Sequence, residues 1–273
     1  MLGQDLIKTI KYAKINGLST RIVTNGWWAK DYMTAQNKIN MLQQAGLDEI
    51  NFSTGDDHQQ WIPFTYVRNA AVAAFRQGMY CAINVETKDD SKFNIDKIIE
   101  KDHILSEHST NNIYERRKIY IEKGIWAQFD GSNEKITYKA YESNFKFKRC
   151  KNLFSIIPIN PYGEVLACCG ITSESNLYMR LGNINHENIK TVYERAFCDV
   201  LKLWLFTEGP EKIAKFLLSH EDENDTQINV QHTCLLCRKI SCSKKYIDIL
   251  IKYRKEYMTN LILKYNLLTF KEK

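Results

Sequence analysis

Hydrophobic residues in the first half of the chain follow two alternating spacings. Helical spacing predicts helices over residues 6–15, 32–44, 63–77 and 95–101, and Gly17 and Gly46 stop the first two. Short runs of apolar and β-branched residues predict strands over residues 20–24, 48–53 and 79–86, and a short strand at Ile104 and Leu105. Regular alternation of strands and helices favours parallel β/α units, although the chain opens on a helix with no strand before it.

The end of the chain has a strong helical pattern over residues 244–264. One face carries an apolar stripe, and lysines lie opposite; the stripe consists of Tyr246, Leu250, Tyr253, Tyr257 and Leu261. Such a stripe is more typical of a core-facing helix than of a nucleic-acid-binding surface. A basic RNA-associated protein therefore stays a minor alternative.

Composition sets limits on the class of protein. With 273 residues, the chain is long enough for one large or two modest domains. The formal charge of +6 is mild for this length, and the lysines are scattered, so nucleic acid is an unlikely partner. No apolar run approaches a membrane span and no apolar leader precedes the chain, so we expect a cytoplasmic protein without a membrane partner.

The candidate chemistry lies in the cysteines of the second half. Cys150 is followed by a Gly-x4-Cys segment that ends at Cys168, and a later Cys-x2-Cys segment supplies Cys234 and Cys237. Thiols delivered in this way can reach a tetrahedral set of positions, which suits an iron–sulfur cluster or zinc. Cys169 and Cys242 are spare candidates, and either could replace one of the four.

Other interpretations of the cysteines remain open. Cys81 and Cys198 lie in apolar runs and are predicted to be core residues. Disulfides are disfavoured because nothing indicates an oxidising compartment. A zinc-binding interaction module without enzymatic activity is the main alternative, since His232 lies two residues before the Cys-x2-Cys segment and a mixed site is possible.

Polar residues follow the predicted strands of the first half. Parallel β/α barrels gather their chemistry at the carboxyl ends of the strands. The residues at those positions include Asn25, Ser53, Asp56, Asp57, His58 and Glu86. Each could serve as an ordinary turn or helix cap, but together they are predicted to form one rim around a ligand.

These segments together resemble a known family. The run from Val23 to Gly26, and the run from Ala45 to Ser53 with Asp56 and His58, resemble the middle of the radical S-adenosylmethionine (radical SAM) enzymes. The spacing of the second-half cysteines resembles the auxiliary-cluster extension of that superfamily, of the SPASM or shorter twitch type. Leu181 to Ile184, followed by a helix near Val192, resembles the linker within such domains.

The resemblance implies an α/β fold of two parts. We expect an incomplete (β/α)6 partial TIM-type barrel that lacks its first strands, over residues 1–125, and a connecting segment over residues 126–145. A small α+β SPASM- or twitch-like iron–sulfur cluster domain would follow over residues 146–245, with a C-terminal helix over residues 246–273. In this interpretation Cys150, Cys168, Cys234 and Cys237 hold an auxiliary 4Fe-4S cluster that serves electron transfer or substrate anchoring.

The sequence also departs from the family. The Cys-x3-Cys-x2-Cys triplet that holds the catalytic cluster does not occur in it, and a Gly-Gly-Glu segment is absent too. The chain then corresponds to a C-terminal portion that does not cleave S-adenosylmethionine alone and has no assigned catalytic residue. The resemblance places Ser53, Asp56 and Glu86, with Asn25, near that cofactor. Its binding would require the missing region, supplied by a separately encoded N-terminal radical SAM fragment, and the substrate would be a peptide or a small molecule.

Overall fold

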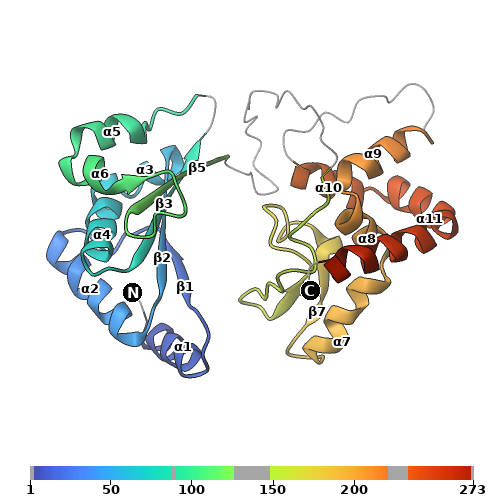
Figure 1. Cartoon of the computed structure of the whole chain (residues 1–273), viewed down its shortest axis with the longest axis horizontal. Coiled ribbons are helices and arrows are strands. Elements are labelled where there is room, and N and C mark those ends of the chain that lie inside the picture. Colours follow the sequence, from blue (N-terminus) through green and yellow to red (C-terminus); the bar gives the residue numbers. More distant parts are fainter. Residues whose placement is uncertain (1–2, 88–89, 126–147, 221–232, 272–273) are drawn as a thin grey trace. The chain divides into compact units, whose positions relative to one another are not determined.

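The computed structural model describes residues 3–87, 90–125, 148–220 and 233–271 (Figure 1). The chain divides into two compact units, residues 1–126 and 127–273. Each unit has its own hydrophobic core. Each is therefore described by itself.

Unit 1 is built on a parallel sheet, which confirms the α/β class. Its strands are β1 (Arg21–Thr24), β2 (Glu49–Thr54), β3 (Tyr80–Thr87), β4 (Ser109–Thr110) and β5 (Ile119–Ile125). They are ordered β1-β2-β3-β5-β4, and every neighbouring pair is parallel. The strands β1, β2 and β3 follow chain order, as in a β/α barrel, whereas β5 lies between β3 and β4.

The helices of unit 1 cover the apolar face of this sheet (Figure 1). Those that contribute to the core are α1 (Gln4–Ile15), α2 (Tyr32–Ala45), α4 (Phe64–Arg76), α5 (Ile95–Lys101) and α6 (His103–His108). The short helix α3 (Asp56–Gln59) follows β2 and has no buried residue. Asp31 caps α2 by accepting a hydrogen bond of 2.8 Å from the Thr34 amide, and Gly46 ends it at φ 98°. Ile50, Phe52 and Ile83 are fully buried beneath the helices. Because side chains alternate along a strand, the intervening residues lie on the opposite face.

That opposite face is polar. It carries Glu49, Asn51 and Ser53 from β2, and Asn84 and Glu86 from β3. The Oδ1 atom of Asn51 is buried and has no hydrogen-bond partner in the described part of the chain. A buried acceptor without a partner is uncommon in a folded protein, so this face carries hydrogen-bonding capacity beyond what the sheet itself uses.

The short strand predicted at Ile104 and Leu105 is wrong, because these residues lie in helix α6. The cause is Asp102, whose carboxylate accepts hydrogen bonds of 3.0 and 3.1 Å from the amides of Ile104 and Leu105. Although an apolar pair such as Ile104 and Leu105 is typical of a strand, the cap at Asp102 starts a helical turn here. The neighbouring strand, β4, begins only at Ser109.

Unit 2 is a helical unit with one small hairpin. Strands β6 (Glu164–Leu166) and β7 (Arg180–Asn183) pair antiparallel. The helices are α7 (Ile189–Glu194), α8 (Val200–Thr207), α9 (Pro210–Leu218), α10 (Thr233–Ser241) and α11 (Lys244–Lys271), with 3-10 turns at η1 (Leu177–Met179) and η2 (Arg195–Cys198). Trp204 of α8 stacks on Tyr257 of α11 at a centroid distance of 4.7 Å.

The apolar stripe of α11 faces the core, as predicted. Tyr246, Leu250 and Leu261 are buried in the same cluster as α8 and α9. In the described ranges of both units, no helix is long and apolar enough to cross a membrane.

The first prediction concerns Asp102. Arg68 donates two hydrogen bonds to its carboxylate, and this partner holds the pKa of Asp102 below its usual value of 3.8. The charged pair therefore stabilises unit 1 fully above about pH 5, and the contribution is lost as pH falls through the lowered pKa. We expect Asp102→Asn to reduce the free energy of unfolding by about 1–2 kcal/mol at pH 7 and by less at about pH 3, as measured by urea unfolding.

Asp5→Asn is the matched control, because the Asp5 carboxylate is exposed and, in the described part of the chain, forms a surface ion pair with Lys8. We expect it to change the unfolding free energy little at either pH. An Asp102→Asn effect of equal size at both pH values would contradict the role of the ion pair.

Candidate metal centre

Separate segments of unit 2 carry the candidate cysteines. Cys150 lies beside α8, and its amide donates to the Leu205 carbonyl at 2.9 Å. Cys168 follows β6 at the end of the hairpin. Cys234 and Cys237 lie in the first turns of α10, three residues apart and therefore on one helix face.

The four predicted ligands are mutual neighbours. Burial is the main cause of the raised pKa of Cys168, Cys234 and Cys237, and thiolate charge on the other cysteines adds to it. Charge on Cys150 raises the pKa of all three. Charge on Cys234 raises that of Cys168 and Cys237, and charge on Cys168 raises that of Cys237. Every pair within the set is therefore close enough to interact electrostatically.

The turn after Cys168 lies against the sulfurs of Cys168 and Cys234. The backbone amide of Gly170 acts to lower the pKa of Cys168, and that of Ile171 acts to lower the pKa of Cys234, although burial outweighs both effects. A β-carbon at Gly170 would lie 3.1 Å from the Cys234 Sγ and 3.7 Å from the Cys168 Sγ. Successive backbone N–H groups of this kind form concave anion sites that are common around iron–sulfur clusters.

Burial governs the protonation of these thiols. It raises the pKa of Cys168 to about 11 and that of Cys237 well above its ordinary value of 9.0. Both are therefore neutral thiols near pH 7 in the chain without metal. Binding of a metal or cluster would displace these protons, because the thiolate is the ligand.

The spare candidates lie at the margin of the set. Cys169 and Cys242 are exposed, and the Cys242 thiol donates to the Asn176 Oδ1 at 3.7 Å. Charge on Cys169 raises the pKa of Cys168 and Cys234, whereas charge on Cys242 raises that of Cys237. The structure thus places both beside the predicted ligands.

The remaining cysteines divide between the core and the surface. Cys81 is buried, as predicted, and burial raises its pKa to about 12. The prediction of a core position for Cys198 is wrong, because this residue ends the η2 turn and is exposed. All eight cysteines lie in described segments, and none forms a disulfide. His232, the possible mixed-site ligand, lies outside the described residues.

The four thiols do not converge on a single point. Among the residues that the structure describes, no three His, Cys, Asp or Glu side chains are arranged to hold one metal ion. Sequence reasoning also missed the groups around the thiols, namely Gly170, Ile171 and Thr172. The Thr172 hydroxyl donates to the carbonyl of Cys234 at 3.1 Å. The Cys-Cys-Gly sequence was the available signal, since glycine allows a close approach of backbone.

In unit 1 the predicted rim residues lie at, or just after, the carboxyl ends of neighbouring parallel strands. Asn25 follows β1 and is exposed, Ser53 lies near the end of β2, and Glu86 lies near the end of β3. The Asn25 Oδ1 accepts a 3.3 Å hydrogen bond from the Trp27 amide. This residue therefore closes a turn, in agreement with the simpler alternative for it.

The two rim carboxylates hold local structure together. Glu86 Oε1 accepts a hydrogen bond of 2.8 Å from the Asp57 amide, and Glu86 Oε2 lies 3.1 Å from His58 Nδ1. A β-carbon at Gly55 would lie 1.8 Å from the Glu86 Cγ, so this close approach requires glycine. Asp56 accepts from the amides of Lys92 and Phe93, the latter at 2.7 Å.

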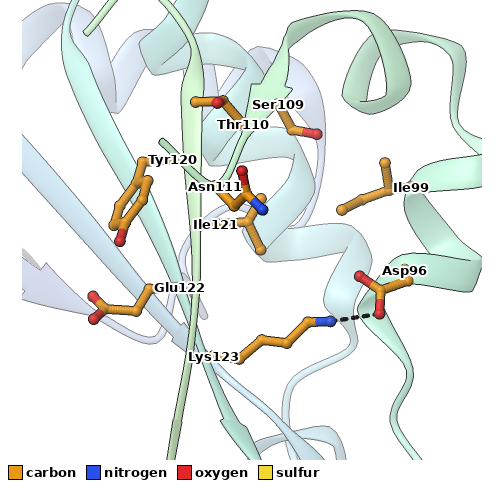
Figure 2. Close-up of a pocket in the computed structure, with 9 residues that line it drawn as sticks. All are labelled: Asp96, Ile99, Ser109, Thr110, Asn111, Tyr120, Ile121, Glu122 and Lys123. Carbon is orange, nitrogen blue, oxygen red and sulfur yellow. Dashed lines mark hydrogen bonds and ion pairs between the residues drawn. The ribbon is translucent and has the colours of Figure 1, made fainter. Parts of the chain in front are cut away.

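A separate hollow lies along β5 (Figure 2). It has a volume of about 500 Å³ and is lined by Asp96, Ile99, Ser109, Thr110, Asn111, Tyr120, Ile121, Glu122 and Lys123. Lys123 Nζ pairs with Asp96 Oδ2 across it at 2.5 Å. Cysteine and the rim residues are absent from this lining, so the hollow is independent of both candidate sites.

Comparison with known proteins does not assign the chain to a family. No protein-family model matches the chain, and no curated protein is similar to it at a meaningful level. The site is therefore interpreted from its own geometry.

The second prediction tests the close approach at Gly170. We expect Gly170→Ala to lower the unfolding free energy of the metal-free protein by about 1 kcal/mol or more relative to Gly124→Ala, because the new β-carbon would crowd Cys234. Gly124 is a matched control, since a β-carbon there meets nothing within 4 Å. Both changes restrict the unfolded chain alike, so urea unfolding isolates the steric effect. Equal stability of the two variants would contradict the observed packing.

Proposed function

We propose that unit 2 binds a 4Fe-4S cluster through Cys150, Cys168, Cys234 and Cys237. The observation that carries the proposal is the close approach of two sulfurs to Gly170, where a β-carbon would lie 3.1 Å from the Cys234 Sγ and 3.7 Å from the Cys168 Sγ. Hydrogen bonds to sulfur and exclusion of solvent are the means by which proteins tune such clusters. The buried Cys168 and the half-buried Cys237 supply the second of these.

A cluster accommodates the arrangement of the thiols better than one zinc ion does. A single zinc needs its thiolates within about 2.3 Å of one point. In a four-iron cluster each thiolate binds a different iron, so the sulfurs stay farther apart. Four thiols that are mutual neighbours without meeting at one point fit that requirement. The zinc-binding module is the competing proposal, and the metal content decides between them.

The proposed role is that of an auxiliary cluster, in electron transfer or substrate anchoring. Four cysteines would occupy all four irons, so the cluster would carry electrons or anchor a substrate without binding it directly to iron. The resemblance to SPASM and twitch domains supports this role. The chain's own residues would supply the buried thiols and the amide donors.

The same proposal takes unit 1 as part of a radical SAM-type β/α barrel in the cytoplasm. The parallel order of β1, β2 and β3, with helices on one face and polar residues on the other, supports it. Contact of Asn25, Ser53, Asp56 and Glu86 with S-adenosylmethionine, a separately encoded N-terminal fragment as partner and a peptide or small-molecule substrate all stay predictions.

The third prediction tests the cluster. After anaerobic reconstitution with iron and sulfide, we expect about four irons per chain and the broad visible absorbance of a 4Fe-4S cluster. Cys237→Ser should abolish most of both, whereas Cys198→Ser, which removes an exposed cysteine outside the set, should retain them. Stoichiometric zinc in the purified protein, together with failure to take up iron, would overturn the proposal in favour of the zinc module.

The fourth prediction concerns S-adenosylmethionine. Because the chain contains no Cys-x3-Cys-x2-Cys triplet, the reconstituted protein should produce no 5′-deoxyadenosine under a strong reductant. The amount formed is measured by chromatography against a cluster-free sample. Turnover above that background would mean that another set of cysteines replaces the triplet.

A further inference from the structure

The thiol set depends on holding helix α10 in one orientation against the turn after Cys168. Cys234 and Cys237 belong to α10, while Cys168 belongs to the hairpin. A helix that rolls about its axis or slides along it would move both of its sulfurs away from the Cys168 turn. A pair of contacts at separate points along α10 is needed to prevent both movements.

The first contact lies at the start of α10. The Thr172 hydroxyl donates to the carbonyl of Cys234 at 3.1 Å. Thr172 is buried, with 6% of its surface exposed. This bond fixes the position of the first turn of the helix relative to Gly170, which lies two residues earlier.

The second contact lies at the end of α10. Asn176 Nδ2 donates to the Ser241 Oγ at 2.8 Å, and the Ser241 hydroxyl lies 3.0 Å from the Asn176 Oδ1. The exposed fractions are 1% for Asn176 and 5% for Ser241. The Ser241 hydroxyl has one proton and also lies 3.2 Å from the Arg238 carbonyl of α10, so the bond donated by Asn176 is the one that joins the two segments throughout. Because both side chains are buried, water does not replace this bond.

The position of Ser241 connects this pair to the thiols. Ser241 follows Cys237 by four residues and Cys234 by seven, so the three side chains share one face of α10. Asn176 lies on the same turn-containing segment as Cys168 and Gly170, and its Oδ1 also accepts from the Tyr178 amide at 3.2 Å. The pair therefore joins the cysteine-bearing face of the helix to the segment that carries the third thiol.

We propose that Asn176 and Ser241 are positioning residues that hold Cys234 and Cys237 in register with Cys168. The inference rests on the proposed cluster for its functional meaning, but the positioning itself is a property of the metal-free chain. Asn176 also holds the Cys242 thiol at 3.7 Å. Asn176 therefore also gives the spare Cys242 thiol a hydrogen-bond partner beside the four predicted ligands.

The test begins with the metal-free protein. A short bis-alkylating thiol reagent is used to cross-link Cys168 to Cys234, and mass spectrometry quantifies the product. The background carries Cys169→Ser and Cys242→Ser. Asn176→Ala and Ser241→Ala should each slow cross-linking about tenfold. The double variant should be no slower than either single variant, because both changes remove the same link.

Asn160→Ala is the matched control. Asn160 is also a buried asparagine of unit 2, with 8% of its surface exposed, but its hydrogen bonds stay within the turn at residues 160–164. We expect it to lower the thermal unfolding midpoint while leaving the cross-linking rate near that of the parent. Equal cross-linking rates for Asn176→Ala and Asn160→Ala would overturn the proposal.

The reconstituted protein provides a second, separate measurement, made with all eight cysteines present. Iron release to a chelator should be about tenfold faster in Asn176→Ala than in Asn160→Ala, and the electron paramagnetic resonance spectrum of the reduced cluster should change only in the former. Release rates and spectra that match in the two variants would also overturn the positioning role. If the parent protein takes up no iron, the proposed function fails, while the cross-linking result still decides whether the pair positions the thiols.

Discussion

The sulfur atoms of Cys168 and Cys234 both lie close to Gly170, although Cys234 is more than sixty residues away in the chain. The close approach of Cys168 and Cys234 to Gly170 constrains the rest of unit 2, because the hairpin and helix α10 must meet within a few ångströms at this point. The backbone amides of Gly170 and Ile171 act to lower the pKa of Cys168 and Cys234, respectively, and so favour negative charge there. Burial acts in the opposite direction by keeping the thiols neutral. The site therefore combines groups that favour thiolates with surroundings that disfavour them when metal is absent.

Much of the fold could be predicted from the sequence because its periodicity agrees with the packing. The helices and strands that carry Ile39, Phe52 and Ile83 lie where the apolar spacing places them. The wrong strand at Ile104 and Leu105 shows where apolar spacing is insufficient. The carboxylate of Asp102 caps helix α6, and this cap decides the structure of the apolar pair. Strands β4 and β5 were not predicted, and their order could not be, because strand order depends on long-range packing, which local spacing does not encode.

The candidate site could be predicted only in part. Cysteine spacing singled out residues 150, 168, 234 and 237, because thiols are rare and their positions along the chain are informative; their role as ligands stays a prediction. The groups that hold them in place are common residue types. Nothing in the sequence distinguishes Asn176 or Ser241 from any other asparagine or serine. Their pairing depends on two segments that lie 65 residues apart in the chain. Such contacts can be found only once the fold is known.

The energetics of polar groups differ between the two units. In unit 1, Glu86 and Asp56 already accept hydrogen bonds from backbone amides, so a ligand at the rim would have to replace bonds that the fold uses. In unit 2, Cys168 is buried and Cys237 half-buried, and desolvation raises the pKa of both thiols and so opposes their ionisation. Iron would supply the positive charge that offsets this cost, so binding and folding of unit 2 would reinforce each other. The chain's own structure thus favours the thiol set over the rim as the place where a metal cofactor would stabilise it most.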